Sequence, residues 1–306
     1  MSEKIDLTKI LTETRNPATL DIDALATIDM VRKMNDEDLK VPAAVREQLA
    51  EIAELIDIIA AAFQKGGRLF YIGAGTSGRL GILDASECPP TYGVSADMVQ
   101  GLIAGGLPAV FAAQEGAEDS LELAQGQLLE QNLKADDVVV GLAASGRTPY
   151  VIAGLKFAKT VGCKTGSIAC TNNSAIGLIA DVAIELLTGP EVITGSTRMK
   201  AGTAQKLVLN MLSTGAMIKS GKVFSNLMVD VQSTNKKLVE RAKRIAINAT
   251  GCDYETAEQA IAASDGSVKT AIVMIIAGVD VVVARRALVE SNGFTADALK
   301  SLVKNG

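Results

Sequence analysis

The chain has 306 residues, of which 48% are apolar, so it can build one large hydrophobic core and a smaller appended domain. Its net charge is −5 and it has no block of Lys and Arg, so nucleic acid is not an expected partner. It contains no histidine, which excludes Ser-His-Asp and Cys-His triads and every zinc site that uses histidine. Acid and base chemistry must therefore use carboxylates, Lys, Tyr or Cys.

The N-terminal two thirds alternates predicted helices and strands. Residues 42–63 have apolar side chains at helical spacing and predict a long amphipathic helix. Short apolar runs then predict buried strands at residues 68–73, 98–104, 137–143, 165–170 and 182–187. Segments compatible with helices lie between them, at residues 79–86, 120–131, 149–161 and 174–179. This alternation predicts an α/β fold, with a parallel sheet of about five strands covered by helices on both faces in three layers.

After Gly195 the pattern predicts helices only, at residues 203–219 and 228–248. The last segment predicts a short helix, a turn, a second helix over residues 254–263, another turn, and an apolar helix from Val268. This order resembles the small three-helix module of the ubiquitin-associated (UBA) type, for which packing or dimerisation is a more common role than partner binding. We therefore predict two domains, residues 1–240 and residues 241–306.

The sequence also predicts the compartment. Charged residues occur within the first four positions and no apolar stretch of a signal peptide follows, so we expect a cytoplasmic protein. The four cysteines form no C-x-x-C pair and are expected to be ordinary small hydrophobes in a reducing compartment. Residues 271–284 are very apolar, but Gly278 and Asp280 interrupt them and they are shorter than the ~20 residues of a membrane span. They predict buried core, and no membrane partner is expected.

The first predicted strand leads directly into a glycine-rich loop, Gly73-Ala74-Gly75-Thr76-Ser77-Gly78-Arg79, and then into a helix. This G-x-G-x-x-G match requires a dinucleotide site to be considered. In a dinucleotide-binding fold, an acidic residue at the end of the second strand holds the ribose. Here that strand ends in Ala104-Gly105-Gly106, so the sequence does not support a dinucleotide.

A similar loop follows the third predicted strand, Ala143-Ala144-Ser145-Gly146-Arg147-Thr148. Glycine lets backbone approach a ligand closely, helix N-termini point free N–H groups outward, and hydroxyls donate further hydrogen bonds. Together these features favour a monophosphate. The alternative is that the Ser and Thr side chains only cap their helices. The predicted phosphate-binding residues are Gly75, Thr76, Ser77, Gly78, Ser145, Gly146, Arg147 and Thr148.

These loops belong to a larger set of unusual stretches, which includes Asp84-Ala85-Ser86-Glu87-Cys88-Pro89-Pro90 and the segment from Gly195 to Thr203. From about Ile22 to the C-terminal module, the chain resembles the N-acetylmuramic acid 6-phosphate etherases of the sugar isomerase (SIS) superfamily. The resemblance implies an SIS-type sheet, a homodimer, a sugar-phosphate substrate, and neither metal nor other cofactor. It also implies cleavage of the D-lactyl ether of N-acetylmuramic acid 6-phosphate to N-acetylglucosamine 6-phosphate and D-lactate.

The resemblance implies two catalytic glutamates, Glu87 after Asp-Ala-Ser and Glu115 in Glu-Gly-Ala-Glu-Asp. Without it, Glu87 would be an ordinary carboxylate at a helix end and Glu115 a solvated loop charge. Glu191 is a reserve candidate. Arg198 and Lys200 are candidates for attracting the phosphate or the lactyl carboxylate, with surface solvation equally expected. Isomerases of the superfamily carry further polar residues where this chain has Ala143 and Ala144, so their phosphate contacts do not transfer residue by residue.

If residues 77–87 form one straight helix, Glu87 is ~15 Å from the first loop, beyond the reach of a hexose 6-phosphate bound there. We therefore expect the Glu87 of one subunit to complete the site of the other, near the subunit interface. A sugar-phosphate sensor similar to glucokinase regulatory protein is the alternative function, and an aldose–ketose isomerase is a third.

Overall fold

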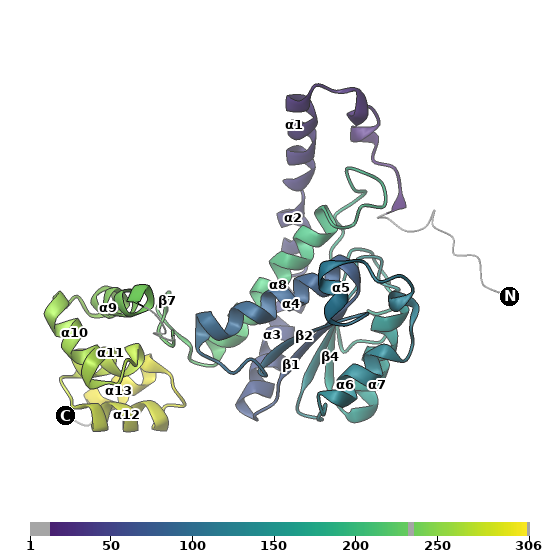
Figure 1. Ribbon diagram of the computed structural model, residues 1–306. Coiled ribbons are helices and arrows are strands. Elements are labelled where there is room, and N and C mark those ends of the chain that lie inside the picture. The colour runs from purple at the N-terminus through teal and green to yellow at the C-terminus, as the bar shows by residue number, and fades with distance from the viewer. Residues whose placement is uncertain (1–12, 232–235, 305–306) are drawn as a thin grey trace. The chain divides into compact units, whose positions relative to one another are not determined.

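The computed structural model describes residues 13–231 and 236–304 (Figure 1). The chain forms two compact units. The sheet unit comprises the chain up to Ser86 and from Asp97 to Ser213, and the helical unit comprises Glu87–Ala96 and the chain from Thr214. The predicted domain boundary at residues 240 and 241 lies inside helix α9 of the helical unit. Compactness does not test which part folds independently, so that boundary stays a prediction.

The sheet unit contains five parallel strands in the order β2-β1-β3-β4-β5, and all five predicted strands are confirmed. Their bounds are Leu69–Gly73 (β1), Val99–Ile103 (β2), Val138–Leu142 (β3), Lys164–Ala169 (β4) and Val182–Glu185 (β5). The central strands β1 and β3 are buried along their whole length, as expected for apolar runs covered on both faces. Gly73 at the end of β1 is in register with Ile103 on β2 and Leu142 on β3, so these strands end at one edge of the sheet.

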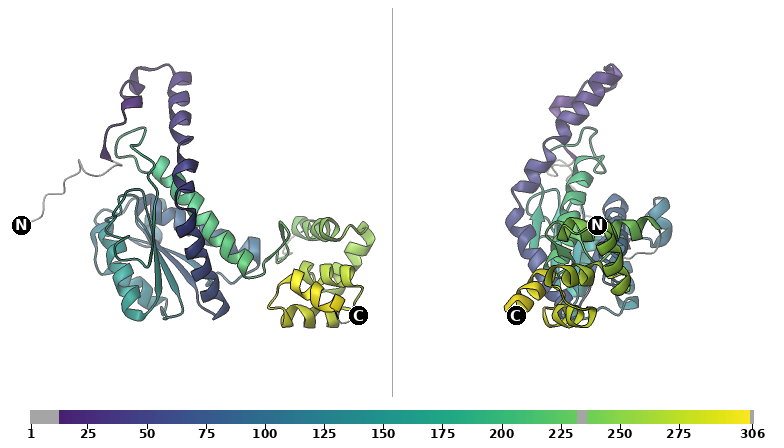
Figure 2. Two further views of the ribbon diagram at one scale, coloured as in Figure 1. Left: turned by 180° about the vertical axis from the view of Figure 1, so that it is seen from behind. Right: turned by 90° about the vertical axis from the view of Figure 1, so that its left-hand side faces the viewer.

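Helices cover both faces of this sheet, which confirms the three-layer α/β architecture (Figures 1 and 2). On one face, Phe70 and Ile72 of β1 pack in a core with side chains of α6 and α7. On the opposite face, α4 approaches Tyr71 at Gly81, and α3 approaches β4 through Leu55. The helices are α1 (Thr27–Asp38), α2 (Val41–Arg46), α3 (Leu49–Gln64), α4 (Gly75–Tyr92), α5 (Leu107–Phe111), α6 (Leu123–Glu130), α7 (Pro149–Val161) and α8 (Lys200–Lys219). Helices α4 and α8 begin in the sheet unit and end in the helical unit.

Two predictions for the sheet unit were wrong in detail. The single helix predicted over residues 42–63 is divided into α2 and α3, because Gln48 leaves helical geometry and its side-chain oxygen accepts the N–H of Glu185 at 2.7 Å. The helix predicted over residues 174–179 is a turn instead. Its Ile176 N–H donates to the carbonyl of Gly146, so this segment supports the second glycine loop.

The helical unit contains more elements than the three predicted helices. A short antiparallel hairpin, β6 (Val223–Phe224) and β7 (Leu227–Met228), occurs where only helix was expected, and α9 begins at Lys236 rather than near Met228. The helices are α9 (Lys236–Thr250), α10 (Tyr254–Ala263), α11 (Val268–Ala277), α12 (Val281–Glu290) and α13 (Thr295–Lys304).

Local signals define the helix ends in this unit. Asp253, Ser267 and Asp280 each accept a backbone N–H at a helix N-terminus, and Gly278 ends α11 in the left-handed conformation. Among the residues with described structure, no single helix is both long and apolar enough to cross a membrane. The helices α10 and α11 meet that criterion only as a pair bent by 119°. The buried core predicted at residues 271–284 is present in part, since α11 contributes Ala271, Ile272 and Val273 to the interior.

Candidate active site

The candidate site lies where the strand order of the sheet reverses. The chain moves from β1 to β2 on one side and returns to β3 on the other side of β1, which is the position where open parallel sheets bind ligands. Because β1 and β3 are neighbours and end in register, their two glycine loops lie side by side, with strands about 4.8 Å apart. The structure therefore brings together the two loops that the sequence predicted to hold a phosphate.

The first loop allows close approach of backbone through two different glycines. Gly75, at the start of α4, has a φ of +53°, and a Cβ there would meet no atom within 4 Å, so the space in front of it is open. At Gly78, a Cβ would lie 2.6 Å from Ile103 Cγ1 and 2.7 Å from the carbonyl oxygen of Gly73. Gly78 therefore lets α4 pack tightly against the strands, while Gly75 leaves the N-terminus of α4 accessible.

The second loop turns sharply at Gly146, which has a φ of +69°. A Cβ at Gly146 would lie 2.4 Å from the Cβ of Ser174, so only glycine fits. Thr148 is the N-cap residue of α7, but its side chain makes no capping hydrogen bond. Within the described part of the chain, the hydroxyls of Thr76, Ser145 and Thr148 make no hydrogen bond. The alternative that Thr148 only caps its helix is therefore not supported, and three hydroxyls can donate to a bound anion.

Ser77 differs from the other hydroxyl residues, because it is buried and donates to Gln205 Oε1 of α8 at 2.9 Å. Its side chain is engaged within the protein, and only its backbone N–H remains for a ligand. Gln205 is 1% exposed, and its Nε2 has no partner among the described residues. The sequence did not indicate this contact, which joins residues 128 positions apart.

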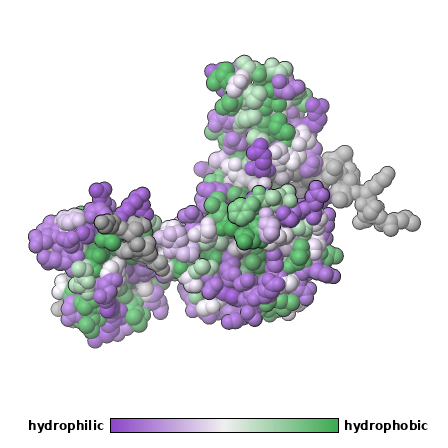
Figure 3. Space-filling view, in the orientation of Figure 1, coloured by the Kyte–Doolittle hydropathy of each residue, from purple (hydrophilic) through white to green (hydrophobic). Residues whose placement is uncertain are grey.

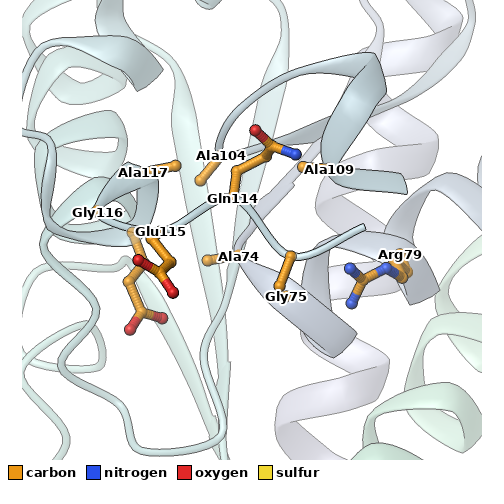
Figure 4. Close-up of a pocket in the computed structure, with 11 residues that line it drawn as sticks. Ala74, Gly75, Arg79, Ala104, Ala109, Gln114, Glu115, Gly116 and Ala117 are labelled. Carbon is orange, nitrogen blue, oxygen red and sulfur yellow. The ribbon is translucent and has the colours of Figure 1, made fainter. Parts of the chain in front are cut away.

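A pocket of about 260 Å³ adjoins the first loop (Figure 4). The lining residues come from the β1–α4 loop, the first turns of α4, the residue after β2, α5 and the segment that follows α5. They are Ala74, Gly75, Arg79, Ala104, Ala109, Ala113, Gln114, Glu115, Gly116, Ala117 and Glu118. In the close-up, Glu115 and Arg79 lie on opposite sides, with Ala74 and Gly75 between them. The pocket therefore combines a predicted catalytic glutamate, the phosphate loop and Arg79, which was not among the predicted site residues.

The other predicted site residues lie outside this pocket. Glu87 is exposed on α4 in the helical unit and is not a lining residue. The structure confirms that α4 is continuous through Glu87, which therefore lies ten positions after Ser77, ~15 Å along the helix axis. Arg147 is exposed in the second loop.

Two of the reserve candidates have structural roles instead. Glu191 is fully buried and accepts the N–H groups of Lys200 at 2.9 Å and Ala201 at 3.0 Å, so it caps α8. Burial raises the pKa of Glu191, and these two N–H groups oppose that rise. Lys200 is 1% exposed, and its ammonium lies 2.6 Å from Glu37 Oε2. Arg198 is exposed, as expected for surface solvation.

The Glu37 carboxylate is held charged inside the protein. Burial alone would raise the pKa of Glu37, but hydrogen bonds from Lys200, Lys40 and Asn16 outweigh burial and lower it to about 2. Lys200 is therefore committed to an internal ion pair and is not available to a substrate anion.

A second buried carboxylate lies in the middle of α4. Asp84 is 8% exposed, and Ser213 of α8 donates to its Oδ1 at 3.0 Å. Burial raises the pKa of Asp84 to about 6, against the hydrogen bonds of Ser213 and Tyr71 and the charge of Lys206.

Comparisons with known proteins agree with this geometry. A family model of the SIS domain matches residues 115–215, and a model of the glucokinase regulatory protein N-terminal SIS domain matches residues 51–159. A phosphosugar isomerase assigned to capsule formation, from Bacteroides fragilis, has a TM-score of 0.51 at 18% identity, covering 66% of this chain and 95% of that chain, which shows the fold alone.

Curated relatives are much more similar. N-acetylmuramic acid 6-phosphate etherase 2 of Vibrio parahaemolyticus is 57% identical over 298 residues, which is 97% of this chain and 99% of that protein. The N-acetylmuramic acid 6-phosphate etherase of Aeromonas hydrophila is 59% identical over 290 residues, which is 95% of this chain and 97% of that protein. With such identity over nearly its whole length, the chain belongs to the N-acetylmuramic acid 6-phosphate etherase family of SIS-domain proteins.

Proposed function

We propose that this protein is a carbon–oxygen lyase that cleaves the D-lactyl ether of N-acetylmuramic acid 6-phosphate, in the recycling of cell-wall amino sugars. The observation that supports this function best is a glutamate, Glu115, in a pocket that adjoins a cradle for an anion. A sugar phosphate is the substrate class that such a cradle fits, and the products are N-acetylglucosamine 6-phosphate and D-lactate.

The phosphate group is proposed to lie at the N-termini of α4 and α7. Both helices start directly after the glycine loops, and the first turn of each helix has N–H groups without intrahelical partners. The hydroxyls of Thr76, Ser145 and Thr148 add donors that no described residue occupies. These contacts hold the sugar at its phosphate end and leave its other carbons to the pocket.

The proposed chemistry needs one base and one acid. In the open-chain sugar, the aldehyde at C1 acidifies the hydrogen on C2, and a carboxylate removes it as a proton. The electron pair of that C–H bond forms a double bond between C2 and C3, and the C3–O bond breaks. A carboxylic acid protonates the departing lactyl oxygen, and water then adds its oxygen to C3 and a proton to C2. Each positioned proton transfer contributes roughly 10²- to 10⁴-fold to the rate.

Glu115 and Glu87 are the proposed acid and base, and the order in which they act is left open. Because Glu87 lies ~15 Å along α4 from Ser77, we propose that it serves the site of the other subunit in a homodimer. Exposed apolar side chains support such a dimer (Figure 3), since α5, next to the pocket, exposes Leu107 and Phe111 at 74% and 84%.

Mixing Glu87→Gln chains with Ser145→Ala chains should restore activity in heterodimers, and heterodimers without activity would contradict the shared site.

Release of D-lactate from N-acetylmuramic acid 6-phosphate is the direct test of this function. In water labelled with ¹⁸O, the label should appear in the C3 hydroxyl of the sugar and not in the lactate. Glu115→Gln should abolish lactate release, while Glu118→Gln, in the same pocket, should retain it. Substrate that remains intact with wild-type protein would contradict the proposal and would favour a sugar-phosphate sensor. The match with the glucokinase regulatory protein model also points to such a sensor. Formation of a ketose phosphate would favour an isomerase.

The proposed location is the cytoplasm. The structure shows four free cysteines, and a reducing compartment maintains cysteines in this form.

A further inference from the structure

Arg79 provides the positive charge among the described residues that line the pocket. The same pocket contains two carboxylates, Glu115 and Glu118. A ligand group that carries a negative charge would be repelled by these glutamates, unless a cation offsets them. Arg79 is therefore the described lining residue whose charge can offset the two glutamates.

The guanidinium of Arg79 is oriented by the protein but is not neutralised by it. Its Nε donates to the carbonyl of Val110 at 2.9 Å, which fixes one edge of the guanidinium. Among the described residues, no carboxylate lies within ion-pair distance of it, although Arg32, Arg68, Arg244 and Arg285 each have such a partner. Arg79 is half-buried and lines the pocket, and its two terminal NH₂ groups remain as donors for a ligand (Figure 4).

We propose that Arg79 binds the lactyl carboxylate of the substrate and thereby distinguishes the substrate from the product sugar. This inference rests on the proposed function. N-acetylmuramic acid 6-phosphate has two anionic groups, and the two glycine loops account for the phosphate alone. The carboxylate is attached through the ether oxygen to C3, the carbon at which the proposed reaction occurs. The product N-acetylglucosamine 6-phosphate has no carboxylate, so Arg79 contributes to substrate binding and contributes nothing to the binding of this sugar.

The sharpest test combines a protein variant with a ligand variant. Calorimetry measures the binding of the substrate and of its analogue with a carboxamide in place of the lactyl carboxylate. The protein carries Glu115→Gln in every case and is compared with and without Arg79→Gln. Loss of a charge-assisted bidentate contact should weaken substrate binding about 10- to 100-fold. Binding of the carboxamide should change less than about 3-fold, and so should binding of N-acetylglucosamine 6-phosphate.

The control variant is Thr148→Val, which removes a proposed phosphate contact and should weaken all three ligands to a similar extent. Arg79→Lys keeps the charge but loses the bidentate geometry, so it should have an intermediate effect while preserving the fold. If Arg79→Gln weakens the product sugar as much as the substrate, Arg79 binds the phosphate and the proposal is wrong. The calorimetry does not depend on turnover, so failure to release lactate would overturn the proposed function without deciding the role of Arg79.

Discussion

The buried carboxylate of Asp84 makes the stability of the protein depend on pH in a direction that can be measured. Burial raises the pKa of Asp84 from 3.8 to about 6, so the folded state binds a proton more tightly than the unfolded state. At pH 7 the carboxylate is charged in both states. As the pH falls from about 6 to about 4, the folded state takes up the proton first, and the free energy of unfolding rises. A shift of about 2 pKa units corresponds to about 3 kcal/mol.

The measurement is urea unfolding of wild-type and Asp84→Asn protein, followed by circular dichroism between pH 4 and pH 7. The Asn variant cannot titrate, so the free energy of unfolding of the wild type should gain about 3 kcal/mol relative to the variant as the pH falls. Ser213→Ala is the companion variant. It removes a hydrogen bond that lowers the pKa of Asp84, and it should extend the pH dependence upward. A constant difference between wild type and Asp84→Asn over this range would refute the reasoning.

Three further variants test other parts of the structure. Gly146→Ala should destabilise the protein by well over the ~1 kcal/mol expected for its control, Gly66→Ala. Both glycines have a positive φ, but only at Gly146 would the added Cβ lie 2.4 Å from a neighbouring atom. Equal melting temperatures of the two variants would contradict this. Lys200→Met leaves the Glu37 charge buried without its main partner and should lower the free energy of unfolding in urea by about 3–5 kcal/mol. An unchanged free energy of unfolding would show that the Lys200–Glu37 ion pair is not required for stability. Thr148→Val should raise KM at least 5-fold with normal folding, and an unchanged KM would remove its hydroxyl from the phosphate site.

The sheet and its two loops could be predicted because their signals are local. Buried strands are continuous apolar runs, and both loops place glycine where the backbone turns directly after such a run. The break between α2 and α3 was missed because it depends on a side-chain contact of Gln48 with β5, far along the chain.

The polar contacts of the site were harder to predict. Ser77 has the same local pattern as Ser145, but Gln205, which engages its hydroxyl, lies 128 positions away. The pairing of Lys200 with Glu37 joins residues 163 positions apart, so the sequence alone left Lys200 as an anion-binding candidate. A signal for Arg79 was present, because a Ser-Gly-Arg sequence occurs in both loops. Its role depends on the segment after α5 that faces it, and that placement is a property of the fold.

The carboxylate of Glu191 is a permanent negative cap at the N-terminus of α8. The first turn of α8 lies beside the phosphate loop, since a Cβ at Gly202 would be 3.4 Å from Thr76 Cγ2, and an uncapped α8 would attract anions in its own right. Because Glu191 already accepts the N–H groups at this helix end, the N-terminus of α8 does not offer a competing anion site beside the proposed phosphate site.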